Sequence, residues 1–153
     1  MQYAQIGKYI FSFFLLVLLQ ITIFFHTSIF GVAYCFIYVS LILFLPVFIP
    51  RSWLMTIGFV LGLVIDMFYD TPGINTFACV TVAFIKNPLF SVFMNPNDLD
   101  ERDTISITSI SVGVFVPFVA ILLFVHHFLV LFLQNFDIQN FFYILLSSTL
   151  STV

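Results

Sequence analysis

The chain is poor in charge. Of its 153 residues only four are lysine or arginine and seven are aspartate or glutamate, so 7% are charged, against about 25% in soluble domains. Hydrophobic residues make up 62% of the chain, which is more apolar surface than so short a chain can bury in a soluble core. The lack of charge therefore excludes a soluble domain and predicts an integral membrane protein.

Cysteine and histidine are also scarce, which bears on metal and redox chemistry. Cys35 and Cys79 both fall in apolar segments and predict neither a disulfide framework nor a metal spacing. His126 and His127 are adjacent, so on a helix they point about 100° apart, and His26 lies in another segment. The chain has no glycine-rich phosphate loop, no nucleophile beside a base and no basic patch for nucleic acid. We therefore expect no enzyme, no cofactor and no nucleic-acid partner.

The apolar runs predict helices rather than a membrane β-barrel, because strict alternation of apolar and polar residues is absent. We expect an all-α, polytopic membrane protein with one domain over residues 1–153. About six spans are expected, near 7–25, 29–49, 53–68, 73–86, 112–133 and 138–153. The fourth and sixth are short against the ~20 residues usually needed. The fourth span could end with Lys86 reaching toward the interface, followed by an interfacial piece over 89–94.

The basic residues predict the orientation. With six spans and a cytoplasmic N-terminus, Lys8, Arg51, Lys86 and Arg102 all face the cytoplasm, and the outer connections hold no lysine or arginine. This is the distribution that the positive-inside rule describes. The same distribution results if the third and fourth segments form a re-entrant hairpin, so the sequence leaves both arrangements open.

The third apolar segment contains the most informative polar residue. Gly58, Gly62, Asp66 and Asp70 follow one another at four-residue spacing and form a drifting stripe along one side of a helix. Because a charge inside lipid costs roughly 2.5–3.5 kcal/mol on insertion scales, we expect this side to face protein. The two glycines predict close helix packing, either within this chain or against another subunit.

Asp66 has two open interpretations. It is either a hydrogen-bonded carboxyl that ties the third and fourth segments together, or a docking residue on a surface that faces a partner. In the first case its partners are expected to be Asn75 or the free backbone N–H groups at the start of the fourth helix.

The turn after Asp66 is predicted from its four residues Asp70, Thr71, Pro72 and Gly73. Thr71 is expected to be the N-cap of the fourth helix, with Pro72 at its first helical position. Asp70 would then lie near the positive end of that helix, close to the outer surface.

The run from Pro50 to Ala78 resembles the signature of the rod shape-determining protein MreD family. Members share a helix with the pattern Gly-Phe-x-x-Gly-x-x-x-Asp, which is Gly58 to Asp66 here, followed by a short glycine-containing outer turn and a small-residue start to the next helix. Outside this run the likeness is one of length and hydropathy. Pro72 and Gly73 are adjacent here, whereas many members place one residue between the corresponding positions.

The resemblance implies a non-enzymatic subunit of the bacterial cell-elongation machinery, located in the inner membrane. Its implied partner is the bitopic protein MreC. Together they are implied to help couple cytoplasmic MreB filaments to the wall-synthesis pair RodA and a class B penicillin-binding protein. Gly58, Gly62 and Asp66 occupy the motif positions of the family. A docking role predicts that Asp66→Leu inserts normally yet no longer co-purifies with MreC, whereas intact association with lowered insertion would favour the hairpin role.

The main alternative is a substrate-binding membrane subunit of an energy-coupled vitamin transporter, which has a similar six-helix plan. Such a subunit is expected to converge polar or aromatic groups on a pocket in the outer half, and usually carries an Ala-x-x-x-Ala pair in its first helix. The first span here lacks that pair, and the only tryptophan, Trp53, lies at the inner end. A third possibility is an assembly factor of a different complex, because a shared fold does not fix function.

Overall fold

The structure is a computed structural model, and its described residues are mostly helical, with one short pair of strands. It describes residues 2–23, 28–29, 33–46, 49–94, 111–135 and 141–152. His26, Arg102 and the acidic connection over 98–103 lie outside the described residues, and so does Asp137.

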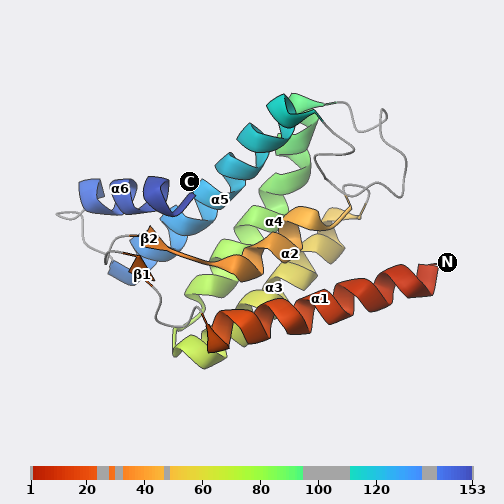
Figure 1. Cartoon of the computed structure of the whole chain (residues 1–153), viewed down its shortest axis with the longest axis horizontal. Coiled ribbons are helices and arrows are strands. Elements are labelled where there is room, and N and C mark those ends of the chain that lie inside the picture. The colour runs from red at the N-terminus through yellow and green to blue at the C-terminus, as the bar shows by residue number, and fades with distance from the viewer. Residues whose placement is uncertain are drawn as a thin grey trace.

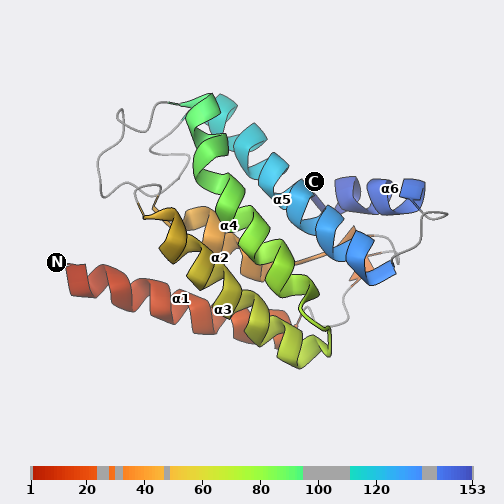
Figure 2. The same ribbon diagram turned by 180° about the vertical axis from the view of Figure 1, so that it is seen from behind.

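The described residues form six α-helices, one 3₁₀ helix and two two-residue strands. They are α1 (Gln2–Thr22), β1 (Ser28–Ile29), β2 (Ala33–Tyr34), η1 (Ile37–Val39), α2 (Ser40–Phe44), α3 (Arg51–Tyr69), α4 (Ile74–Phe93), α5 (Val112–Asn135) and α6 (Phe141–Thr152). The two strands pair antiparallel. In both ribbon views the long helices α1, α3, α4 and α5 lie side by side in that order, with α2 against α1, α3 and α4 and the shorter α6 against α5 (Figures 1 and 2).

Helices α3, α4 and α5 are long and apolar enough to cross a membrane, with 19, 20 and 24 residues. At 1.5 Å per residue these lengths match the ~30 Å hydrocarbon core of a bilayer. Two of these helices contain an internal proline, Pro88 in α4 and Pro117 in α5. Membrane helices tolerate this residue because neighbouring groups satisfy the backbone atoms that it frees.

The core lies where α3, α4 and α5 pack on one another and on η1 and α2. Four of the buried residues of α5 recur at four-residue steps, namely Phe118, Leu122, His126 and Val130, and the other two, His127 and Leu131, each follow one of them. This spacing places all four on one face of the helix. His126 is therefore on the inward face of α5, although its ring is polar.

Large apolar side chains also cover the outside of the helices. Examples are Phe11 in α1, Met67 in α3, Val92 in α4 and Phe142 in α6, which are 68%, 77%, 79% and 85% exposed. Soluble proteins rarely expose continuous apolar surface of this extent. The exposed apolar surface is that of a protein whose outer faces contact lipid.

The segment expected to form the second span, 29–49, is not one helix. Its described residues form β1 in part, β2, η1 and the five-residue helix α2. The backbone N–H of Tyr34 donates to Ser151 Oγ (2.9 Å), and that of Ile37 to Gln20 Oε1 (2.8 Å). Because side chains of α1 and α6 satisfy these groups, the backbone can remain non-helical inside the protein.

The fourth and sixth expected spans also differ in their bounds. Helix α4 does not end near Lys86 but continues through Pro88 to Phe93, so the expected interfacial piece over 89–94 is the last turn of the same helix and its cap. The sixth expected span contains the 12-residue helix α6, which packs beside α5 (Figure 1).

Candidate functional site

The Asp66 carboxylate joins helices α3 and α4. It is 5% exposed, and its Oδ1 accepts hydrogen bonds from the backbone N–H of Asn75 (2.9 Å), from Asn75 Nδ2 (3.0 Å) and from Thr71 Oγ1 (2.6 Å). Its Oδ2 accepts from the backbone N–H (2.8 Å) and from Oγ1 (2.6 Å) of Thr76. The expected link from Asp66 to Asn75 and to free N–H groups of the fourth helix is confirmed.

This arrangement lets a residue of one helix cap the next. The first N–H groups of an α-helix have no partner within the helix, and Asp66 accepts two of them at the start of α4. A carboxylate is also favoured beside the positive end of a helix. Since all five groups that face Asp66 are donors, the pattern suits an ionised carboxylate, which only accepts hydrogen bonds.

The expected N-cap is wrong. The N-cap of α4 is Gly73, with φ of 82° and no side-chain cap, and Pro72 lies before the helix. Thr71 Oγ1 donates to Asp66 instead. Because Asp66 already accepts the N–H groups of Asn75 and Thr76, no Thr71 cap is needed. The turn needs a residue that tolerates a positive φ, which glycine does at no steric cost.

Asp70 is a turn residue, but it ends α3 rather than opening α4. It is the C-cap of α3 with φ of 52°, and its backbone N–H donates to the carbonyl of Asp66. Aspartate and asparagine enter this left-handed region more readily than most residues. The exposed turn therefore consists of a left-handed Asp70 and a left-handed Gly73, with Thr71 and Pro72 between them.

Gly58 and Gly62 pack against α4 within this chain. A Cβ atom at Gly58 would lie 3.0 Å from the carbonyl oxygen of Cys79 and 3.3 Å from the Cβ of Ala83. A Cβ atom at Gly62 would lie 2.4 Å from the Cα of Thr76. The glycines therefore bring the α4 backbone within reach of Asp66, and the intramolecular alternative is the one that the structure contains.

A buried polar chain continues from this hairpin to α5. The hydroxyl of Tyr38, in η1, donates to Asn75 Oδ1 (2.7 Å) and lies 3.0 Å from His126 Nε2. Tyr38 and His126 are 0% exposed, and Asn75 is 1% exposed. The sequence pattern did not predict a role for Tyr38. A polar residue within an apolar run was the available signal.

Gln20, in α1, forms a second polar junction that the sequence analysis also missed. Its Nε2 donates to the Tyr69 hydroxyl (2.8 Å) and to the carbonyl of Cys35 (3.2 Å), and its Oε1 accepts from Ile37 N–H (2.8 Å). Gln20 is 0% exposed. It thereby ties the end of α1 to the end of α3 and to the non-helical stretch before η1.

His126 and His127 do not share a site. Their ring centroids are 5.7 Å apart at 82°, and His127 Nδ1 lies 2.6 Å from the carbonyl of Leu123, one turn earlier in α5. Among the described residues no three metal-binding side chains gather. Cys35 and Cys79 are both free thiols.

Lys86 is buried rather than reaching to the interface. It is 0% exposed, and its Nζ donates to the carbonyls of Ile42 (2.8 Å) and Leu45. These carbonyls lie at the C-terminal end of α2, where backbone acceptors have no partner within the helix and a cation is favoured. Lys86 is in place to hold a five-residue helix that is too short to be stable alone.

We expect Lys86→Met to loosen α2 selectively. Hydrogen bonds to charged groups contribute about 1.5–3 kcal/mol, so backbone amides over 40–45 should exchange at least about tenfold faster. Hydrogen–deuterium exchange of the protein in micelles measures this. Ser91→Ala, which removes an exposed hydroxyl bonded to its own helix, is the control. Unchanged exchange over 40–45 in Lys86→Met would contradict the assigned role.

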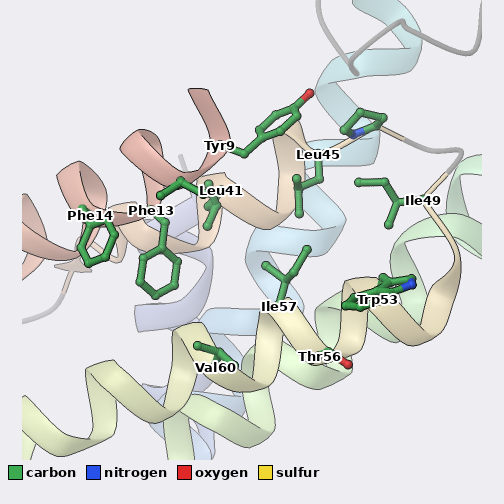
Figure 3. A pocket seen from close by; sticks show the side chains of 12 residues that line it. Tyr9, Phe13, Phe14, Leu41, Leu45, Ile49, Trp53, Thr56, Ile57 and Val60 are labelled. Atoms are coloured by element: carbon green, nitrogen blue, oxygen red, sulfur yellow. The ribbon is translucent and has the colours of Figure 1, made fainter. Parts of the chain in front are cut away.

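An apolar groove of about 770 Å³ opens between α1 and the first half of α3 (Figure 3). Phe13 and Phe14 line it from α1, Leu41 from α2, Leu45 from the residue that follows α2, and Ile57 from α3. Ligand pockets usually combine an apolar lining with a few convergent polar groups. Thr56, which also lines this groove, donates its hydroxyl to Ser52 of its own helix (2.9 Å). The groove therefore suits an apolar occupant better than a polar one.

Comparison with known proteins adds no assignment: no family model, no curated protein and no solved structure matches the chain.

Proposed function

We propose that this chain is a non-enzymatic integral membrane subunit of the bacterial cell-elongation complex, similar to the MreD family. One observation supports the proposal: the motif positions Gly58, Gly62 and Asp66 all act in one structural unit, the α3/α4 hairpin. The three motif residues thus shape the hairpin through close packing and hydrogen bonding. A protein that binds others through its shape needs such a rigid unit.

The proposed partner is an MreC-like protein with a single span, through which MreB filaments are linked to RodA and a class B penicillin-binding protein. The proposed location is the bacterial inner membrane, with six passes and a cytoplasmic N-terminus. The starts of α1 and α3 lie at one end of the molecule and the α3/α4 turn lies at the other (Figure 1), which supports this arrangement. Labelling of Lys8→Cys by a maleimide added outside intact cells would contradict it.

Affinity purification in mild detergent tests the proposal. The tagged chain is expected to bring down an MreC-like protein, and its depletion is expected to turn rod-shaped cells round. Recovery of a different membrane complex, with cell shape unchanged after depletion, would favour an assembly factor of that complex and contradict an elongation role.

Two variants separate the possible modes of docking. Asp66→Leu and Gly62→Ala disturb the same hairpin, but only the first removes the carboxylate. If the partner recognises the shape of the hairpin, both variants lose the partner. If the partner contacts the carboxylate itself, the Gly62→Ala protein that inserts into the membrane still binds the partner. Because the Asp66 carboxylate is 5% exposed and accepts five hydrogen bonds within the α3/α4 hairpin, we expect recognition by shape.

The vitamin-transporter alternative receives less support from the geometry. Its pocket is expected in the outer half with converging polar groups, whereas the groove flanks the first half of α3, near Trp53, and is almost entirely apolar. Thermal stabilisation of the purified protein by a vitamin would contradict our proposal, since a ligand that binds the folded state raises its stability.

A further inference from the structure

Four buried side chains from separate segments form one continuous chain of hydrogen bonds. His126 Nε2 in α5 lies 3.0 Å from the Tyr38 hydroxyl in η1, which donates to Asn75 Oδ1 at the start of α4 (2.7 Å). Asn75 Nδ2 in turn donates to Asp66 Oδ1 at the end of α3 (3.0 Å). None of the four is more than 5% exposed, so water does not compete with these bonds.

The chain has a direction, and the Asp66 carboxylate sets it. The Asn75 amide must turn its NH₂ group toward the carboxylate, because its oxygen would be repelled there. Asn75 Oδ1 then faces Tyr38, which gives its only hydroxyl proton to that oxygen. Toward His126 the Tyr38 oxygen can therefore only accept, so His126 carries its proton on Nε2.

An unpartnered atom agrees with this direction. His126 Nδ1 is buried and has no hydrogen-bond partner within the part of the chain that the structure describes. In the Nε2–H tautomer this nitrogen is a bare acceptor, whereas in the other tautomer it would be a buried N–H without an acceptor. Orphaned buried donors are rarer than orphaned acceptors. The geometry around His126 thus favours the same tautomer as the chain that starts at Asp66.

The exposed α3/α4 turn is connected to the start of this chain. Thr71, in that turn, donates to Asp66 Oδ1 (2.6 Å) and accepts from Asn75 Nδ2 (3.0 Å). Its neighbours Asp70, Pro72 and Gly73 are exposed. A molecule that contacts this turn can therefore reach Thr71 without entering the helix bundle.

From these contacts we infer that Tyr38 is a relay: it connects His126 in α5 to the Asp66 carboxylate, which sets the tautomer of His126, and to the hydrogen bonds of Thr71 in the α3/α4 turn, which alter the environment of His126. Tyr38 belongs to neither α3, α4 nor α5, so it can couple the hairpin to the next helix. A contact made at the turn then changes the hydrogen bonding of His126 in α5. The coupling is internal to this chain, whichever molecule contacts the turn.

Ring-nitrogen NMR of the full chain, labelled with ¹⁵N-histidine, tests the relay. His126 is assigned by loss of its signals in His126→Gln. The wild-type spectrum is expected to show a protonated Nε2 and a bare Nδ1 for His126. A wild-type His126 that is protonated on Nδ1 would overturn the inference, and this outcome needs no variant.

Variants then test the transmission. Thr71→Val is expected to shift the His126 ring signals, while Thr81→Val, which removes an exposed hydroxyl from α4, leaves them in place. With Tyr38→Phe also present, Thr71→Val should no longer move them. In unfolding, Thr71→Val and His126→Gln should be non-additive by about fivefold in the equilibrium constant. Additive effects, or an equal shift with and without Tyr38→Phe, would overturn the relay.

Discussion

Asp66→Asn is expected to lower the free energy of unfolding by about 2–3 kcal/mol, whereas Asp70→Asn, four residues later, should change it by less than about 0.5 kcal/mol. In the wild type, one carboxylate oxygen accepts from the Asn75 N–H and the other from the Thr76 N–H. An asparagine at position 66 has only one acceptor oxygen, so it cannot replace both. At least one buried backbone N–H is then left without an acceptor. Asp70 lies in the exposed turn, where asparagine also adopts the left-handed conformation.

Unfolding in mixed micelles, followed by circular dichroism, measures the difference between the two variants. For a chain of this size the loss at position 66 corresponds to a fall in Tm of roughly 4–12 °C. The pair is matched in chemistry, since both changes remove one negative charge. Equal stability of the two variants would show that Asp66 does not cap α4.

The second large effect is expected from Gly62→Ala. Its added methyl group would meet the Thr76 backbone at 2.4 Å from Cα and 2.7 Å from N, and backbone atoms cannot turn aside as a flexible side chain can. Helices α3 and α4 must therefore separate, which also draws Thr76 away from Asp66. We expect a loss of about 3 kcal/mol, at the upper end for an inserted methyl group.

A graded series of glycine variants controls this prediction. Gly58→Ala, 3.0 Å from the Cys79 carbonyl, should lose less stability than Gly62→Ala. Gly113→Ala, in open space at the start of α5, should be neutral or stabilising by up to about 1 kcal/mol through helix propensity. The order is measured by the same unfolding experiment. A Gly62→Ala protein as stable as Gly113→Ala would contradict the close packing of α3 on α4.

The hairpin was largely predictable from the sequence, since its cause is local. Gly58, Gly62 and Asp66 share one side of a helix, and a carboxylate inside lipid needs donors that the start of the next helix can supply. The identity of the N-cap was not predictable. Thr71 beside Pro72 fits a standard capped start. Only the structure shows that the N-cap position is Gly73 and that Asp66, from the preceding helix, accepts hydrogen bonds from the first N–H groups of α4.

The break in the second expected span was not predictable from the pattern. Apart from Ser40, residues 33–44 are apolar or aromatic, with no proline among them, and such a run does not distinguish a helix from extended backbone. The groups that stabilise the break lie far away in sequence, with Ser151 separated from Tyr34 by 117 positions. For the same reason the pairing of Tyr38 with His126, 88 positions apart, could not be derived.

The charged residue Lys86 shows a related limit. Near the end of an apolar run a lysine is expected to extend to the interface. The structure instead gives it the carbonyls at the end of α2, a helix that the sequence did not delimit. The expectation failed because the partner was a backbone feature of another segment and not a side chain that could be read from the sequence.

The most direct test of the account is a scalar coupling across a hydrogen bond, measured by NMR on isotope-labelled protein in micelles. A cross-peak between the Thr76 amide nitrogen and the Asp66 carboxyl carbon is predicted, together with a similar one from the Asn75 amide. Absence of both, with the two amides exchanging as fast as those of the exposed turn, would contradict the capping of α4 by Asp66.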